Sequence, residues 1–88
     1  FPFQPYPRDG SYSIQAENIK LKWIPSRNAV LHKIYFGTDE KNLSLLKEQK
    51  ENIINIGNLE NKKTYYWRID EATGERVIHG DIWHFTTK

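Results

Sequence analysis

Residues 64–70 read TYYWRID, and apolar and polar side chains alternate along them with a period of two. That period is typical of a β-strand that has one face on a core and the other face in water. The alternation assigns Tyr65, Trp67 and Ile69 to the core and Tyr66, Arg68 and Asp70 to solvent. The segment therefore predicts a strand near the middle of a small all-β domain.

Other short segments on both sides of this strand also have the composition of strands. The predicted strands span residues 12–16, 19–23, 30–36, 52–56 and 81–87. Pro25 ends the second of them, because proline cannot donate a hydrogen bond to a continuing sheet. Thr73-Gly74-Glu75 predicts a hairpin turn. Several short strands with no long helix between them predict an antiparallel sandwich.

The alternation also assigns the side chains of these strands to faces. One face of the first strand carries Tyr12, Ile14 and Ala16, and one face of the third carries Val30, His32, Ile34 and Phe36. In the last strand Ile82, His84 and Thr86 point outward. The large side chains predicted to build the core are Trp23, Tyr65, Trp67, Trp83 and Phe85.

Two segments allow more than one structure. Residues 38–50 carry Leu43 and Leu46 at helical spacing, but we favour a single helical turn over residues 39–42 followed by a short edge strand. Residues 1–10 hold three of the four prolines and predict an extended lead-in or linker, or an edge strand, ahead of a domain spanning residues 11–88.

Composition bounds the classes of function. The chain has 88 residues, enough for one domain, and its 14% aromatic residues compensate for only 38% apolar residues. The absence of cysteine excludes disulfides and thiolate chemistry. A net charge of +2 with acids and bases interspersed disfavours nucleic-acid binding, and no apolar run is long enough to enter a membrane. The lack of methionine predicts that the chain is an excised fragment, with any signal sequence upstream.

Several motifs resemble those of fibronectin type III domains. Leu21-Lys22-Trp23-Ile24-Pro25 is similar to the second strand of that family, and Leu59 precedes Tyr65 by the spacing of the tyrosine corner, in which the hydroxyl bonds back to the backbone near the leucine. Residues 34–38, 64–70 and 80–87 resemble the fibronectin-III-like modules of secreted and surface proteins of bacteria, often found beside glycan-active or lectin-like domains.

This resemblance implies an immunoglobulin-like antiparallel β-sandwich of about seven strands and a location that is extracellular, on the cell surface or periplasmic. It implies no chemistry, because the fold serves many functions. His32 departs from the family pattern, since many such domains have an aromatic residue at this inward position.

No group of residues predicts catalysis, and no cofactor is expected. His79, Asp81 and His84 are close in sequence, but in an extended strand His84 lies on the face opposite the other two, so a metal site is not expected. The acidic pairs Asp39-Glu40 and Asp70-Glu71 are interpreted as solvated charges of turns and surface.

The candidate interaction surface is the outward face of the sheet that holds the predicted strands at residues 30–36, 64–70 and 81–87, which are the third, the sixth and the last. Tyr35, Tyr66, Arg68 and His84 are its main predicted residues, with Lys33 and Ile82 alongside. The sequence thus favours a non-catalytic spacer or interaction module whose partners are neighbouring domains of a larger exported protein. The alternative is a carbohydrate-binding module that stacks a glycan on the outward tyrosines.

Overall fold

The computed structural model describes residues 2–88, which form nine β-strands and no helix. The strands are β1 (Phe3–Tyr6), β2 (Ser11–Ile14), β3 (Ile19–Ile24), β4 (Leu31–Gly37), β5 (Ser44–Gln49), β6 (Ile53–Gly57), β7 (Thr64–Ala72), β8 (Val77–Ile78) and β9 (Ile82–Thr87). In this part of the chain there is no helix long and apolar enough to cross a membrane.

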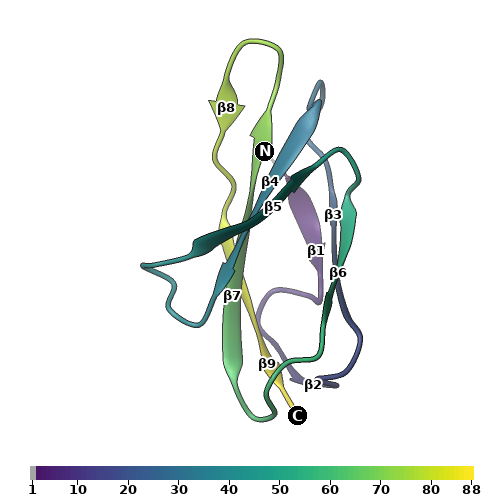
Figure 1. Cartoon of the computed structure of the whole chain (residues 1–88), viewed down its shortest axis with the longest axis vertical. Helices are drawn as coiled ribbons and strands as arrows, with labels where there is room; N and C mark the ends of the chain where they lie inside the picture. The colour runs from purple at the N-terminus through teal and green to yellow at the C-terminus, as the bar shows by residue number, and fades with distance from the viewer. Residues whose placement is uncertain (1) are drawn as a thin grey trace.

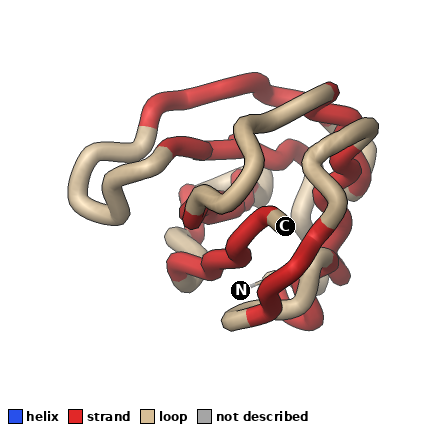
Figure 2. Tube along the Cα trace, turned by 90° about the horizontal axis from the view of Figure 1, so that it is seen from below, coloured by secondary structure: helices blue, strands red, loops and turns tan. Residues whose placement is uncertain are grey.

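The strands make two sheets that pack as an all-β sandwich (Figure 1). The smaller sheet has the order β1-β3-β6, and the larger has the order β2-β9-β7-β4-β5, with β8 paired to β7. Figure 2 looks along the long axis and shows strands joined directly by loops. The all-β sandwich predicted from the alternation is therefore confirmed.

The pairing differs from the prediction in two respects. The structure has nine strands where about seven antiparallel ones were expected, and β2 pairs with β9 in parallel. The first predicted strand is also irregular, because Ser13 has a φ of +58° and this breaks the period of two. As a result Tyr12, predicted to share a face with Ile14, is 79% exposed, whereas Ile14 packs against the core.

The core lies between the two sheets and is built mainly from aromatic rings. Trp67 of β7 packs edge-on against Trp23 of β3, at 6.3 Å between ring centroids, and against Trp83 of β9, at 4.8 Å. Tyr65 stacks on Phe85 at 5.9 Å. All five predicted core residues are buried. Each such side chain contributes about 1.5–3 kcal/mol through removal of apolar surface from water.

A hydrogen bond fixes the turn that leads into β7. The hydroxyl of Tyr65 accepts a hydrogen bond from the backbone N–H of Glu60 at 2.9 Å. Glu60 directly follows Leu59, which packs against the core. The hydroxyl thus bonds back to the backbone beside Leu59, as the resemblance to a tyrosine corner implied.

The two ambiguous segments both form edge strands. Residues 3–6 pair with β3 as β1, and the adjoining Pro2 and Pro7 are buried, so this stretch belongs to the sandwich. Residues 44–49 form β5 after a turn in which Asn42 N donates to Asp39 O at 3.0 Å. The predicted edge strand is thus confirmed, whereas the predicted helical turn over residues 39–42 is wrong, because these residues form a turn without helix.

Candidate interaction surface

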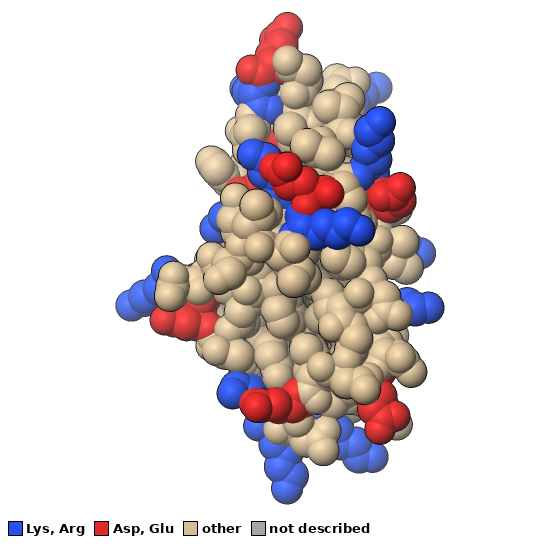
Figure 3. Space-filling model, viewed as in Figure 1, with Lys and Arg blue, Asp and Glu red and all other residues tan. Residues whose placement is uncertain are grey.

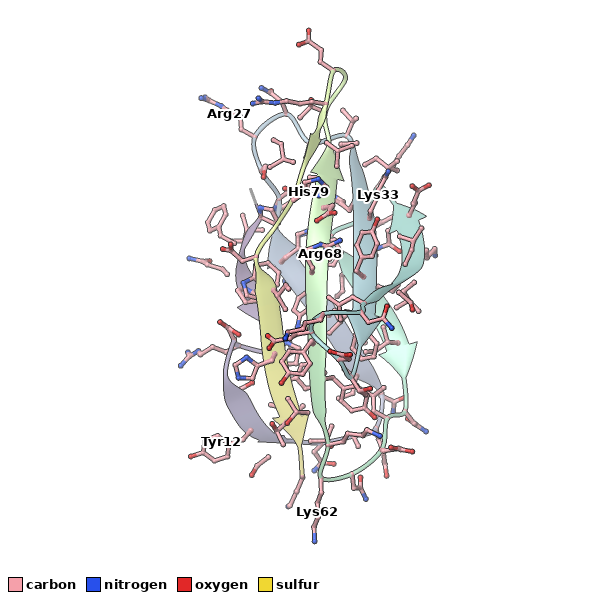
Figure 4. The ribbon with its side chains drawn as sticks, turned by 90° about the vertical axis from the view of Figure 1, so that its left-hand side faces the viewer. Tyr12, Arg27, Lys33, Lys62, Arg68 and His79 are labelled. Carbon is pink, nitrogen blue, oxygen red and sulfur yellow. The ribbon has the colours of Figure 1, made fainter. Side chains whose placement is uncertain are left out.

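The outer face of the larger sheet brings together the residues that the sequence assigned to a surface. The register places Tyr35 of β4 opposite Arg68 of β7, and Arg68 opposite Ile82 of β9. Tyr66 of β7 lies opposite His84 of β9. We call Tyr35, Tyr66, Arg68, Ile82 and His84 the outer face; Figure 4 views the molecule from this side.

Arg68 covers one of the two tyrosines of the outer face. Its guanidinium carbon lies 4.3 Å from the centroid of the Tyr35 ring, a distance typical of a cation–π contact. Its Nε donates a hydrogen bond to Asp70 Oδ1 at 2.8 Å. The guanidinium group of Arg68 is thus held by two contacts, one with a ring and one with a carboxylate.

Asp70 is buried, so the prediction that it points into water is wrong. It lies on the outer side of β7, but the segment after β8 folds over it and leaves its side chain only 2% exposed. Oδ1 also accepts from Gly80 N at 3.1 Å, and Oδ2 lies 2.8 Å from His79 Nδ1. A buried carboxylate is tolerated here because hydrogen bonds from three groups replace its water.

The second tyrosine of the outer face packs against a histidine. The rings of Tyr66 and His84 lie 5.8 Å apart and are tilted by 38°. His84 Nδ1 lies 3.3 Å from Asp9 Oδ1, which also accepts from the backbone N–H of His84 at 2.9 Å. The loop before β2 therefore fixes the position of this ring pair.

Charges on and around the outer face are largely balanced by neighbours. Arg68 and His79 share Asp70, His84 pairs with Asp9, and Lys33 lies 3.6 Å from Glu48. Figure 3 shows acidic and basic side chains interspersed over another side of the molecule, in agreement with the predicted mixed surface. Exposed pairs of this kind add little stability, but they leave this face with little net charge.

Glu71 is also buried, so the interpretation of Asp70-Glu71 as solvated charge is wrong for both residues. Its Oε2 lies 2.8 Å from His32 Nδ1 inside the core, without the alignment of a good hydrogen bond. Its Oε1 accepts from the backbone N–H of Ser26 at 2.7 Å. This pair explains how the sandwich accommodates a polar ring at His32. Asp39 and Glu40 are exposed, as predicted.

The structure separates the three residues considered for a metal site. His79 contacts Asp70, and His84 contacts Asp9 on a different part of the face. Among residues 2–88 no three His, Asp or Glu side chains are close enough together to hold a metal ion.

The sequence contains a signal for the buried pair of His32 and Glu71. The period of two that places Ile69 inward also places Glu71 inward, and His32 was assigned to the inward face of the neighbouring strand. An acid and a base predicted on facing positions indicate a buried pair. The alternation gives no signal that Asp70 is buried, because the residues that shield it from water, His79 and Gly80, lie in a loop.

Comparison of the sequence with known protein families finds no match, and comparison with curated protein sequences finds no significant relative.

Proposed function

We propose that this chain is a non-catalytic module of the fibronectin type III kind, which acts as a spacer and docks a neighbouring domain of a larger exported protein. The family assignment is supported by the hydrogen bond from Glu60 N to the Tyr65 hydroxyl beside Leu59, since this bond at the start of β7 is the feature called a tyrosine corner.

The observation that carries the docking proposal is the fixed arrangement of Arg68 on Tyr35. The guanidinium lies 4.3 Å from the ring centroid, and the buried Asp70 holds it there. Tyrosine and arginine, together with tryptophan, are enriched among the residues that contribute most of the binding energy at protein interfaces. Because the contacts with each other and with Asp70 already restrict the rotamers of Tyr35 and Arg68, these two side chains lose little entropy when a partner binds.

The carbohydrate-binding alternative uses the same tyrosines in a different way. A sugar stacks on a free ring face, whereas Arg68 already lies over the Tyr35 ring. Tyr66 packs against His84 and offers a smaller platform. A protein surface that contacts the arginine and the rings together fits this face better than a glycan does.

The experiment compares the chain alone with a fragment of the parent protein that includes the adjoining domain. We expect amide signals of β4, β7 and β9 to shift in the longer fragment, and the shifts to disappear in Tyr35→Ala and Arg68→Ala. Ile53→Ala is the control, because Ile53 is an exposed apolar residue on β6 of the smaller sheet.

Two outcomes would contradict the docking proposal. One is a set of shifts confined to the smaller sheet. The other is saturable binding on a glycan array that Tyr66→Ala abolishes, which would favour the carbohydrate-binding alternative.

A further inference from the structure

A hollow of about 510 Å³ lies at the end of the sandwich where the loop between β3 and β4 meets the hairpin between β7 and β8. Arg27 and Asn28 line it from the first loop, and Gly74, Glu75 and Arg76 from the hairpin. Figure 4 shows Arg27 at this end of the molecule, beside the hairpin. The hollow is separate from the outer face and has no part in the proposed docking.

Two arginine residues from different loops line this one hollow. Within residues 2–88 neither Arg27 nor Arg76 makes an ion pair with a carboxylate. Arg68, in contrast, is held by Asp70. The donors of Arg27 and Arg76 thus remain available for a ligand, and the planar guanidinium suits the oxygens of phosphate, sulfate and carboxylate.

Hydrogen bonds hold the first of these loops in place. Ser26 N donates to the buried Glu71 Oε1 at 2.7 Å, directly before Arg27. Ala29 N donates to Ser26 O at 3.3 Å, which makes Arg27 and Asn28 the central residues of a turn. Val30 N then donates to Ala72 O at 2.8 Å and ties the loop to the base of the hairpin.

Hydrogen bonds also hold the hairpin between β7 and β8 in place. Thr73 N donates to Arg76 O at 2.8 Å, and the Thr73 hydroxyl accepts from Arg76 N at 3.3 Å. The backbones that carry Arg27 and Arg76 are thus fixed before a ligand arrives, so binding requires little ordering of the chain.

We propose that this hollow is a binding site for a tetrahedral oxyanion, a phosphate or sulfate group, held between Arg27 and Arg76. Two positive charges complement a doubly charged anion better than a monovalent carboxylate. Glu75 also lines the hollow, and its negative charge opposes such an anion. Two residues of the site therefore favour binding of the anion and one opposes it, so substitutions at these positions should change the affinity in opposite directions.

The test is a titration of the ¹⁵N-labelled chain with inorganic phosphate, sulfate and acetate at low ionic strength, with sodium chloride at matched ionic strength as the blank. Saturable shifts are expected at the amides of Asn28 and Gly74, with sulfate and phosphate binding more tightly than acetate. Glucose 6-phosphate and glucose 6-sulfate, in further arms, distinguish recognition of the free ion from recognition of its ester.

Substitutions then separate this site from general attraction of anions. Arg27→Gln and Arg76→Gln should each weaken binding about tenfold, the loss expected for one charged hydrogen bond. Glu75→Gln should strengthen binding about threefold by removing an exposed like charge. Arg8→Gln, outside the hollow, should change nothing. Shifts equal to those of the chloride blank, or unaffected by either arginine substitution, would overturn the proposal, as would weaker binding in Glu75→Gln.

Discussion

His32 and Glu71 face each other across neighbouring strands inside the core, with Nδ1 of the imidazole 2.8 Å from Oε2 of the carboxylate. The ring of Trp23 lies edge-on to His32 at 5.4 Å, so an apolar side chain closes off the pair. The second carboxylate oxygen bonds Ser26 N in the loop that carries Arg27. One buried acid thus connects the packing of the core to the position of a surface loop.

Removing either member of this pair should be far more damaging than removing both. Glu71→Leu leaves a buried imidazole without its acid, and His32→Phe leaves the buried Oε2 of Glu71 facing an apolar ring, so each should cost about 1–3 kcal/mol of unfolding free energy. The double variant restores an apolar core and should recover most of that loss. Urea denaturation of the four proteins measures the coupling, and additive losses would show that the pair acts as two independent groups.

Tyr65→Phe should lower the unfolding free energy by about 0.5–1.5 kcal/mol, because the Glu60 N–H loses its hydrogen-bond acceptor while the ring packing is kept. Tyr66→Phe serves as the matched control, since Tyr66 contacts His84 through its ring, which the substitution keeps. Thermal and urea unfolding of both variants provide the comparison. Equal effects at the two positions would show that the hydroxyl of Tyr65 has no special role in the turn before β7.

Gly80→Ala should destabilise the domain by about 1–3 kcal/mol through overpacking. A Cβ at this position would collide with the carbonyl oxygen of Ile69 and crowd Pro2. The backbone shift would also lengthen the hydrogen bond from Gly80 N to Asp70. Gly74→Ala is the control, because open space surrounds that position. If the two substitutions had equal effects on the melting temperature, the close approach at Gly80 would not matter for stability.

The exposed pair Glu60–Lys63 should give stability a small dependence on pH. The hydrogen bond from Lys63, 2.8 Å long, lowers the pKa of Glu60, and the same bond raises the pKa of Lys63. The Glu60 contribution is present above the unfolded-state pKa of the carboxyl group and is lost as the pH falls through its lowered folded pKa. The Lys63 contribution is present below the unfolded-state pKa and is lost as the pH rises through its raised folded pKa.

Melting temperature measured against pH at low and high salt tests this expectation. In Lys63→Gln, the melting temperature should fall less at acid pH, because Glu60 no longer has the cation that lowers its pKa. High salt should reduce the difference between this variant and the parent chain. A difference that persists unchanged in high salt would contradict an exposed electrostatic origin.

The alternation of side chains predicted most of the sandwich because burial on one face is a local property of a strand. Trp67 and Trp83 could be assigned inward without knowing their partners. The parallel pairing of β2 with β9 could not be predicted, because it joins segments more than sixty residues apart in sequence. In addition, the alternation along β2 is interrupted at Ser13. The prediction that Asp70 is exposed was wrong for a related reason. Its burial depends on His79 and Gly80, which are brought next to it only by the hairpin between β7 and β8.

The candidate surface was predicted better than its chemistry. Strand parity brought Tyr35, Tyr66, Arg68 and His84 to one side of the sheet, as the register shows. Parity gives no information on which side chain covers which, so the contact of Arg68 with Tyr35 was not foreseen. The hollow between Arg27 and Arg76 joins two turns, and turn residues carry no periodic pattern from which their proximity could be inferred.

The parallel pairing of β2 with β9 has a mechanical consequence. Tension that pulls Ser11 and Lys88 apart acts along both strands in opposite directions, so it shears the pair instead of peeling it open. Hydrogen bonds from Gly10 N to His84 O and from Lys88 N to Ile14 O, each 2.8 Å long, brace the two ends of this contact. Sheared bonds must break together, which raises the force needed for unfolding at a given pulling rate. Single-molecule stretching through these two positions, compared with stretching across the β7–β8 hairpin, would show whether this pair resists load as the geometry requires.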